Sequence, residues 1–361
     1  MKFKKILIIT SIILISMSFK SIVFAKENTV DFNEFKRNLV QYDKSGVVTE
    51  YKDNESSDKI INKIIEISKN YIFKETEKTW MLLIKVIIIC FLSSLIKIYV
   101  SDSSLADIAF YACYCLVAYI MINSFKTVSQ LCSESISTLT EFIKFSIPTY
   151  ATTLAMTGYT ASATSVQGLF LGIGVTITHI INSFIIPLLY CCGLVAVVGS
   201  VSTVIDLSKI ISVISKTIKY SMGIIMTVFA GALTFSGLAN ASADNLAIKT
   251  AKYAVANFVP VVGGCLSEAL HSVINSSVVL KNSMGYLCYL VIISICLFPV
   301  IKIAVIIFII RITAALSGFF SENKVGTMIN SLGDVISTML GLLLLTIVMF
   351  VLVIGVIAST G

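Results

Sequence analysis

Few residues in this sequence combine types and spacing that could support chemistry. Glu268 and His271 stand three residues apart, on one face of a predicted helix, where a carboxylate and an imidazole could share a proton or bind a metal. We interpret them as a hydrogen-bonded pair, because His179 is the only other histidine and a histidine-rich metal centre is therefore impossible. The nine cysteines form no CxxC pair, so neither a zinc site nor a thiol-redox site is indicated.

The sequence signatures of common enzymes are also missing. The chain has no GxxxxGK[ST] phosphate-binding loop, no HExxH zinc motif and no GxSxG nucleophile turn. We therefore predict that the protein is not an enzyme and holds no cofactor and no metal.

A break in helical character precedes Glu268 and His271. Asn257, Pro260 and the pair Gly263 and Gly264 interrupt a polar helix, and a new helix follows that we expect to end near residues 281–282. Discontinuous membrane helices expose backbone groups around a cavity in this way. We hypothesise that these six residues form part of a pore or a subunit contact, and the alternative is an ordinary loop at the membrane surface.

Four further ionisable residues lie inside apolar runs, where insertion of a charge costs about 2.5–3.5 kcal/mol at mid-bilayer. We expect Lys85 to extend towards the headgroups and His179 to be a neutral imidazole bonded to a neighbouring helix. Lys302 and Arg311 either line a water-filled path or mark the ends of a short span.

The composition explains why these few polar groups matter. Hydrophobic residues make up 57% of the 361 residues, charged residues only 13%, and the mean hydropathy is +0.94. A soluble domain carries about 25% charged residues, so we predict an all-α polytopic integral membrane protein. The net charge of +7 is scattered, and it suggests contact with lipid headgroups and not with nucleic acid.

Charge also divides the chain into segments. Residues 26–78 hold 21 of the 47 charged residues. Three lysines, an apolar stretch and the small residues at positions 23 and 25 are typical of a secretory signal peptide, with an uncleaved first anchor as the alternative. We predict a signal peptide at 1–25, a polar extracytoplasmic segment with an amphipathic helix at 26–78, and a multi-span transmembrane domain at 79–361.

The apolar body divides into runs near the ~20 residues that cross a bilayer. Because open sheet edges do not persist in lipid, these runs must be helices, and we expect about six to eight. The clear spans are 79–99, 105–125, 221–241 and 335–358, and the longer runs 166–203 and 284–320 contain Pro187 and Pro299.

Amphipathic surface helices are expected between the spans, at 126–146 and 207–219. The second carries three lysines on one face, which favours the cytoplasmic side. Two spans in 166–203 would put it outside, so either 149–165 also inserts or 166–203 crosses once. Small residues predict close helix packing at two places, Gly168 with Gly172 and Gly231 with Gly237.

The stretch around the helix break also resembles a known family. Residues 251–270, AKYAVANFVPVVGGCLSEAL, are similar to the signature of the stage III sporulation protein AE family, and so are LKNSMG at 280–285, LFP at 297–299 and IPT at 147–149. The likeness covers about residues 130–320 and the order of signal peptide, polar segment and apolar body.

This resemblance implies a role in endospore formation. It implies a membrane subunit of the multiprotein channel between mother cell and forespore, in the mother-cell membrane around the forespore. The implied partners are other channel subunits, including a cytoplasmic ATPase and ring-forming extracytoplasmic proteins. The alternatives are a self-contained secondary transporter and a purely structural membrane scaffold.

Overall fold

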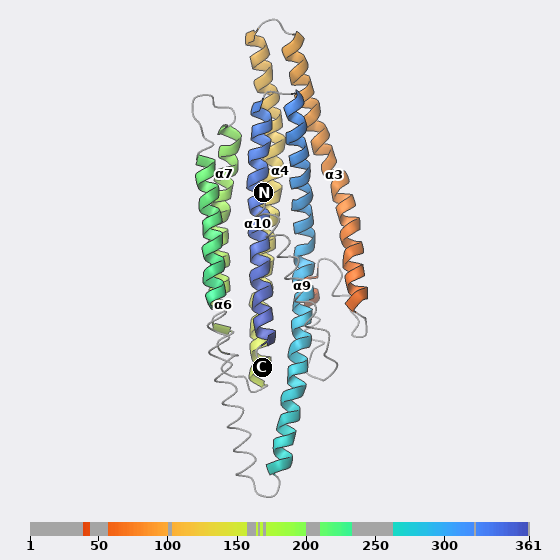
Figure 1. Ribbon diagram of the computed structural model, residues 1–361, viewed down its shortest axis with the longest axis vertical. Helices are drawn as coiled ribbons and strands as arrows, with labels where there is room; N and C mark the ends of the chain where they lie inside the picture. The colour runs from red at the N-terminus through yellow and green to blue at the C-terminus, as the bar shows by residue number, and fades with distance from the viewer. Residues whose placement is uncertain are drawn as a thin grey trace.

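Long helices laid side by side make up the described part of the molecule (Figure 1). The computed structural model describes residues 39–43, 57–99, 103–156, 164, 167–168, 171–199, 210–232, 263–320 and 323–359, and in α9 it describes side chains only from Gly285 onward. No strand occurs among these residues, which confirms the all-α class.

Six of these helices are long and apolar enough to cross a membrane, the lower end of the predicted range. They are α3 (Ser57–Tyr99), α4 (Ser103–Met156), the continuous run α6 (Leu171–Ile180), η2 (Ile181–Ile185) and α7 (Ile186–Gly199), the helix Ile210–Ala232, α9 (Gly263–Phe320) and α10 (Asn323–Ser359). Figure 1 shows that successive helices run in opposite directions.

Helix α4 is much longer than a bilayer requires. At 1.5 Å per residue, the 54 residues of α4 extend about 80 Å, against a hydrocarbon core of about 30 Å. The predicted span 105–125 and the predicted surface helix 126–146 are therefore one helix, and Pro148 lies inside it. The prediction of separate elements is wrong because a polar outer face does not end a helix whose inner face continues to be buried.

The run at 166–203 contains one candidate span. A single crossing here is one of the two alternatives that would place the lysine-rich helix at 207–219 on the cytoplasmic side. Ile186 donates its N–H to the carbonyl of Ile181, five residues back, in the π-helical turn that directly precedes Pro187. A π turn can accommodate both the missing proline N–H and the bulk of the proline ring, so the helix continues through Pro187. Pro299 likewise lies inside α9, which is a single helix through the predicted run 284–320.

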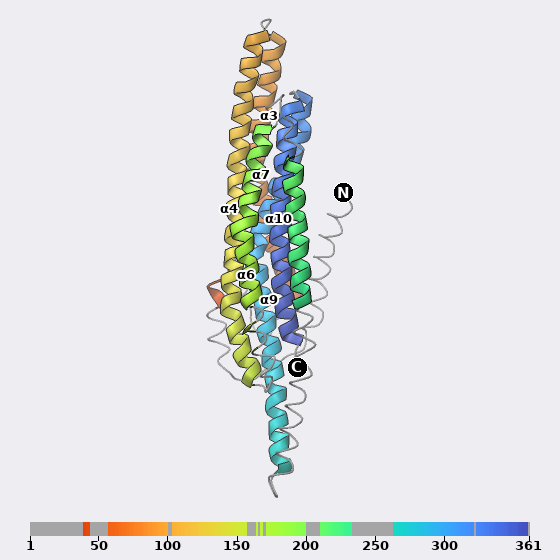
Figure 2. The same ribbon diagram turned by 90° about the vertical axis from the view of Figure 1, so that its left-hand side faces the viewer.

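Helices α9 and α10 lie at the centre of the packing. Helix α9 packs on α3, α4 and α10, and α10 also packs on α4 and α7. Figure 2, turned by 90°, shows α4 along one edge of the bundle and α10 towards the other. The largest fully buried side chains include Phe142 and Tyr150 of α4 and Phe350 of α10.

Candidate functional site

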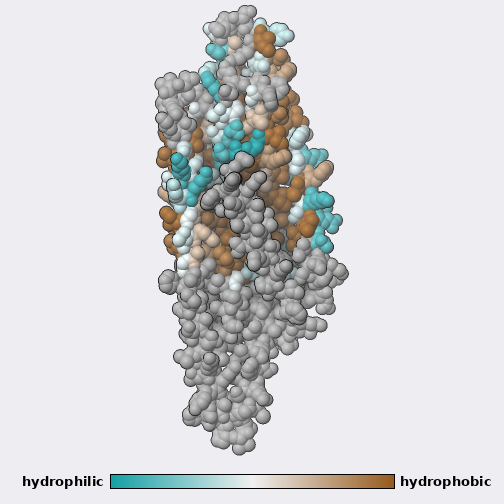
Figure 3. Space-filling view, in the orientation of Figure 1, coloured by the Kyte–Doolittle hydropathy of each residue, from teal (hydrophilic) through white to brown (hydrophobic). Residues whose placement is uncertain are grey.

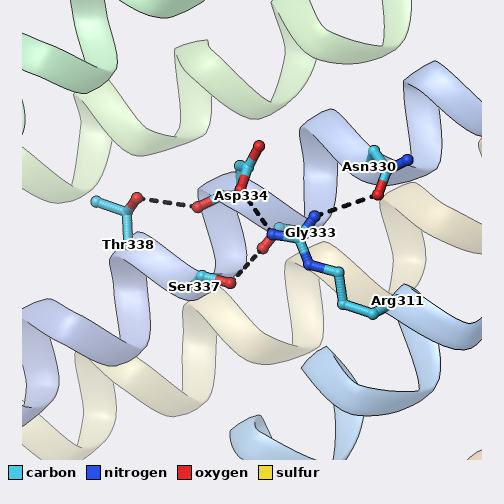
Figure 4. Close-up of polar contacts among 6 residues, drawn as sticks. All are labelled: Arg311, Asn330, Gly333, Asp334, Ser337 and Thr338. Atoms are coloured by element: carbon cyan, nitrogen blue, oxygen red, sulfur yellow. Dashed lines mark hydrogen bonds and ion pairs between the residues drawn. The ribbon is translucent and has the colours of Figure 1, made fainter. Parts of the chain in front are cut away.

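Polar groups that join helices inside apolar spans are the candidate site. Arg311 of α9 forms an ion pair with Asp334 of α10, with 2.6 Å between the guanidinium Nη2 and the carboxylate Oδ1 (Figure 4). Its Nη1 donates to Asn330 Oδ1 at 3.2 Å. Asn330 and Asp334 are four residues apart, so they lie on one face of α10 and both reach the same guanidinium.

Close approach of the two helices makes this geometry possible. A side chain at Gly333 would begin 3.2 Å from Ile310 and 3.6 Å from the Arg311 guanidinium, so the glycine leaves room for the arginine to cross. Ser337 and Thr338 donate their hydroxyls to the carbonyls of Gly333 and Asp334 within α10 (Figure 4).

This cluster is open to the outside of the bundle. The side chains of Arg311 and Asp334 are 37% and 64% exposed. Figure 3 shows hydrophilic surface over the upper part of the α9–α10 pair, bordered by hydrophobic surface. Within membrane spans, ionisable groups usually face a protein interior or water, so this edge is a candidate contact for water or for another subunit.

A second ion pair lies deeper in the bundle. Lys302 of α9 approaches Glu75 of α3, with 3.5 Å between Nζ and Oε1, and the Glu75 side chain is only 10% exposed. One helical turn away, the rings of Tyr71 and Phe298 are in contact, with centroids 4.5 Å apart. The ion pair between Lys302 and Glu75, together with this ring contact, therefore fixes the position of α3 along α9.

Part of the segment that precedes α3 also docks on the bundle. Leu39 is fully buried, and the Tyr42 ring packs edge-on against Phe142 of α4 at 5.6 Å. Ser294, which is fully buried in α9, donates its hydroxyl to Asp43 Oδ1 at 2.6 Å. Residues 39–43 thus contact both α4 and α9.

The other residues singled out in the sequence are not brought together. Lys85 is exposed on α3, and His179 is exposed at the end of α6. Asn257, Pro260 and Gly237 lie outside the described residues. Gly263 begins α9, and Gly264, Glu268 and His271 follow in its first turns, although their side chains are not described. Helix α9 does not end near residues 281–282 but continues to Phe320, because the apolar run after Met284 extends it.

The glycines that mediate close packing in this chain are not the expected ones. A side chain at Gly168, Gly172 or Gly231 would meet nothing within 4 Å. Gly193 of α7, in contrast, lies under the ring of Phe125 of α4, 2.5 Å from where a Cβ would stand. The sequence around Gly193 does not indicate this contact, because Phe125 is far from Gly193 along the chain.

Among the described residues, no group of three or more His, Cys, Asp or Glu side chains is placed to hold a metal ion. The eight described cysteines are free thiols. The candidate site therefore consists of charged side chains that lie between membrane helices.

The six apolar helices among the described residues define a multi-pass α-helical membrane protein. The model of the stage III sporulation protein AE family matches residues 42–361, and the chain belongs to this family. It is 26% identical over 295 residues to the stage III sporulation protein AE of Bacillus subtilis (strain 168), covering 81% of this chain and 74% of that protein. No solved structure matches the chain.

Proposed function

We propose that this protein is a membrane subunit of a multiprotein transport channel between the mother cell and the forespore, required for endospore formation. The observation that carries the proposal is the family match over residues 42–361, which covers the whole apolar body and most of the polar segment before it. A sporulation protein with six candidate spans and charged groups inside them is suited to a membrane-embedded part of a transport complex.

The energy for transport would come from other subunits. The sequence contains no phosphate-binding loop, so a nucleotide motor would be a separate cytoplasmic ATPase. Ring-forming proteins in the space between the two membranes would continue the path, and the chain would lie in the mother-cell membrane that surrounds the forespore. In this proposal the chain is a non-enzymatic platform or gate.

Deletion of the gene and counting of heat-resistant spores test the requirement for sporulation. We expect a loss of several orders of magnitude, with rescue by the intact chain. A tagged chain purified in mild detergent from sporulating cells should bring down membrane and ATPase subunits. Normal spore counts in the deletion strain would refute the proposal, and so would solute uptake by liposomes that contain this chain alone, since that result indicates a self-contained transporter.

A further inference from the structure

Helices α3 and α4 each have an outward face with exposed charged side chains, and the two faces lie on different sides of the bundle. Helix α3 runs along the right-hand edge in Figure 1, and α4 runs along the left-hand edge in Figure 2, a view turned by 90°. Six of the exposed charged residues on these faces are Glu66, Lys69 and Lys74 of α3 and Glu134, Glu141 and Lys144 of α4. None of the six forms an ion pair within the described part of the chain.

Two contacts set the height of α3 against α9. The Lys302–Glu75 ion pair and the Phe298–Tyr71 ring contact each join an α9 residue to the α3 residue whose number is lower by 227. The two helices run in the same direction (Figure 1), and both rise 1.5 Å per residue. The same difference of 227 therefore relates any two residues of α3 and α9 that lie at one height.

Helix α10 relates the heights of α9 and α4. Gly333 of α10 lies against Ile310 of α9, and these two helices run in opposite directions (Figure 1). The Cys132 thiol of α4 contacts the carbonyl of Met339 of α10 at 3.5 Å, and these two helices run in the same direction. Residues of α3 and α4 that lie at one height consequently have numbers that sum to about 209.

Opposite charges lie at the same heights on the two faces. The three level pairs, each matched within about 1.5 Å in height, are Glu66 with Lys144, Lys69 with Glu141 and Lys74 with Glu134. The match does not continue along the whole length of the helices, because Lys85 and Lys126 lie within about 3 Å in height and carry the same charge. The complementary stretch is therefore limited to residues 66–74 of α3 and 134–144 of α4.

An exposed aromatic ring lies in the middle of the charged face of α3. The Phe73 side chain is 77% exposed. It is level with about residue 136 of α4, where the partly exposed Ser133 and Ser137 lie beside Glu134 and Glu141. An aromatic anchor opposite small residues, bordered by complementary charges, is the usual anatomy of a protein–protein contact.

We propose that α3 of one copy of this chain packs against α4 of a second copy, through residues 66–74 and 134–144. A membrane holds all copies in one orientation and at one height, so residues that are level within one copy meet between two copies. The contact joins different surfaces, so each copy binds one neighbour through α3 and another through α4, and the assembly extends into a ring or a filament. The inference needs only the chain in a membrane and does not rest on the proposed transport function.

Disulfide cross-linking in membranes of sporulating cells tests the proposal. Two full-length chains with different tags are produced together, one with Phe73→Cys and one with Ser137→Cys, after the nine native cysteines are replaced by serine or alanine. Each chain then has a single cysteine, so a disulfide that joins both tags forms only between two copies. The matched control has Lys126→Cys in place of Ser137→Cys, an exposed position on the same helix that lies about 15 Å from the height of Phe73.

We expect oxidation to yield a dimer with both tags, at about tenfold the yield of the Lys126→Cys control. Lys69→Glu in the first chain places two carboxylates at one height and should lower the yield about fivefold, since an exposed pair is worth about that factor at most. Glu141→Lys in the second chain should then restore the yield, because the pair again has opposite charges.

Absence of the mixed dimer from chains that accumulate in the membrane would overturn the proposal, and so would equal cross-linking of the control. Failure of Glu141→Lys to restore the yield would show that these charges do not face each other. If the cysteine-free chains do not accumulate, the same substitutions are made with only the exposed Cys115 and Cys191 replaced, and the yields are compared with that parent.

Discussion

The ion pair between Lys302 and Glu75 should hold α3 against α9, and a double-mutant cycle measures how strongly. Lys302→Met removes the cation and keeps the length of the side chain, and Glu75→Gln removes the anion and keeps its shape. The Glu75 side chain is 10% exposed and that of Lys302 is 31% exposed, so the two single variants should not be equivalent.

The geometry sets the magnitude. At 3.5 Å and an effective dielectric constant of about 20, the attraction between the charges is about 5 kcal/mol. Loss of hydration by Glu75 offsets much of this. Lys302→Met leaves that carboxylate buried without its cation and should cost about 3 kcal/mol. Glu75→Gln should cost about 1–2 kcal/mol, because the partly exposed ammonium can turn to water. The double variant should lose about 2 kcal/mol less than the sum.

The single tryptophan of the chain provides the assay. Trp80 lies on α3, five residues from Glu75, so its fluorescence reports the detachment of this helix during denaturant titration of the purified protein in detergent micelles. Glu77→Gln, which changes an exposed carboxylate on the same helix, is the control and should shift stability by less than about 0.5 kcal/mol. Additivity of the two single variants within about 0.5 kcal/mol would refute a direct interaction.

Three other predictions concern single substitutions, the first with a matched control. Gly193→Ala forces an aromatic ring out of its place and should cost about 1–3 kcal/mol in the same titration, whereas Gly172→Ala meets nothing and should leave stability unchanged or slightly raised. Asp334→Asn should cost no more than about 1 kcal/mol, because its ion pair is more than a third exposed, and a loss above 3 kcal/mol would contradict this. Leu39→Ala should speed hydrogen exchange of residues 39–43 and leave the helices protected, since a buried leucine contributes about 2–5 kcal/mol to the docking of its segment. Unchanged exchange would show that this leucine does not hold the segment.

Hydropathy alone predicted the positions of most helices. The runs 79–99, 284–320 and 335–358 each lie within a single helix, namely α3, α9 and α10. This is expected because only a helix lets a single apolar segment in lipid satisfy all its own backbone hydrogen bonds. The pattern did not predict where helices continue beyond the apolar run. Helix α3 begins at Ser57, and the change from polar to apolar sequence near residue 78 falls inside it.

Contacts between distant segments could not be read from the sequence. Glu75 belongs to the charged segment 26–78 and carries no mark that distinguishes it from the other carboxylates there, although it is buried beside Lys302. Gly168 and Gly172 have the spacing of a packing motif but meet no other element, whereas Gly193 has no motif and lies under an aromatic ring. Spacing along one helix shows which residues share a face, and only the fold shows what that face meets.

The single crossing of α6–α7 determines at which end of the bundle the lysine-rich helix begins. Helices α3, α7 and α9 finish at the same end of the bundle (Figure 1), and Lys216, Lys219 and Lys324 lie in the helices that start there. If an export signal places residue 26 outside, this end is cytoplasmic, in agreement with the positive-inside rule.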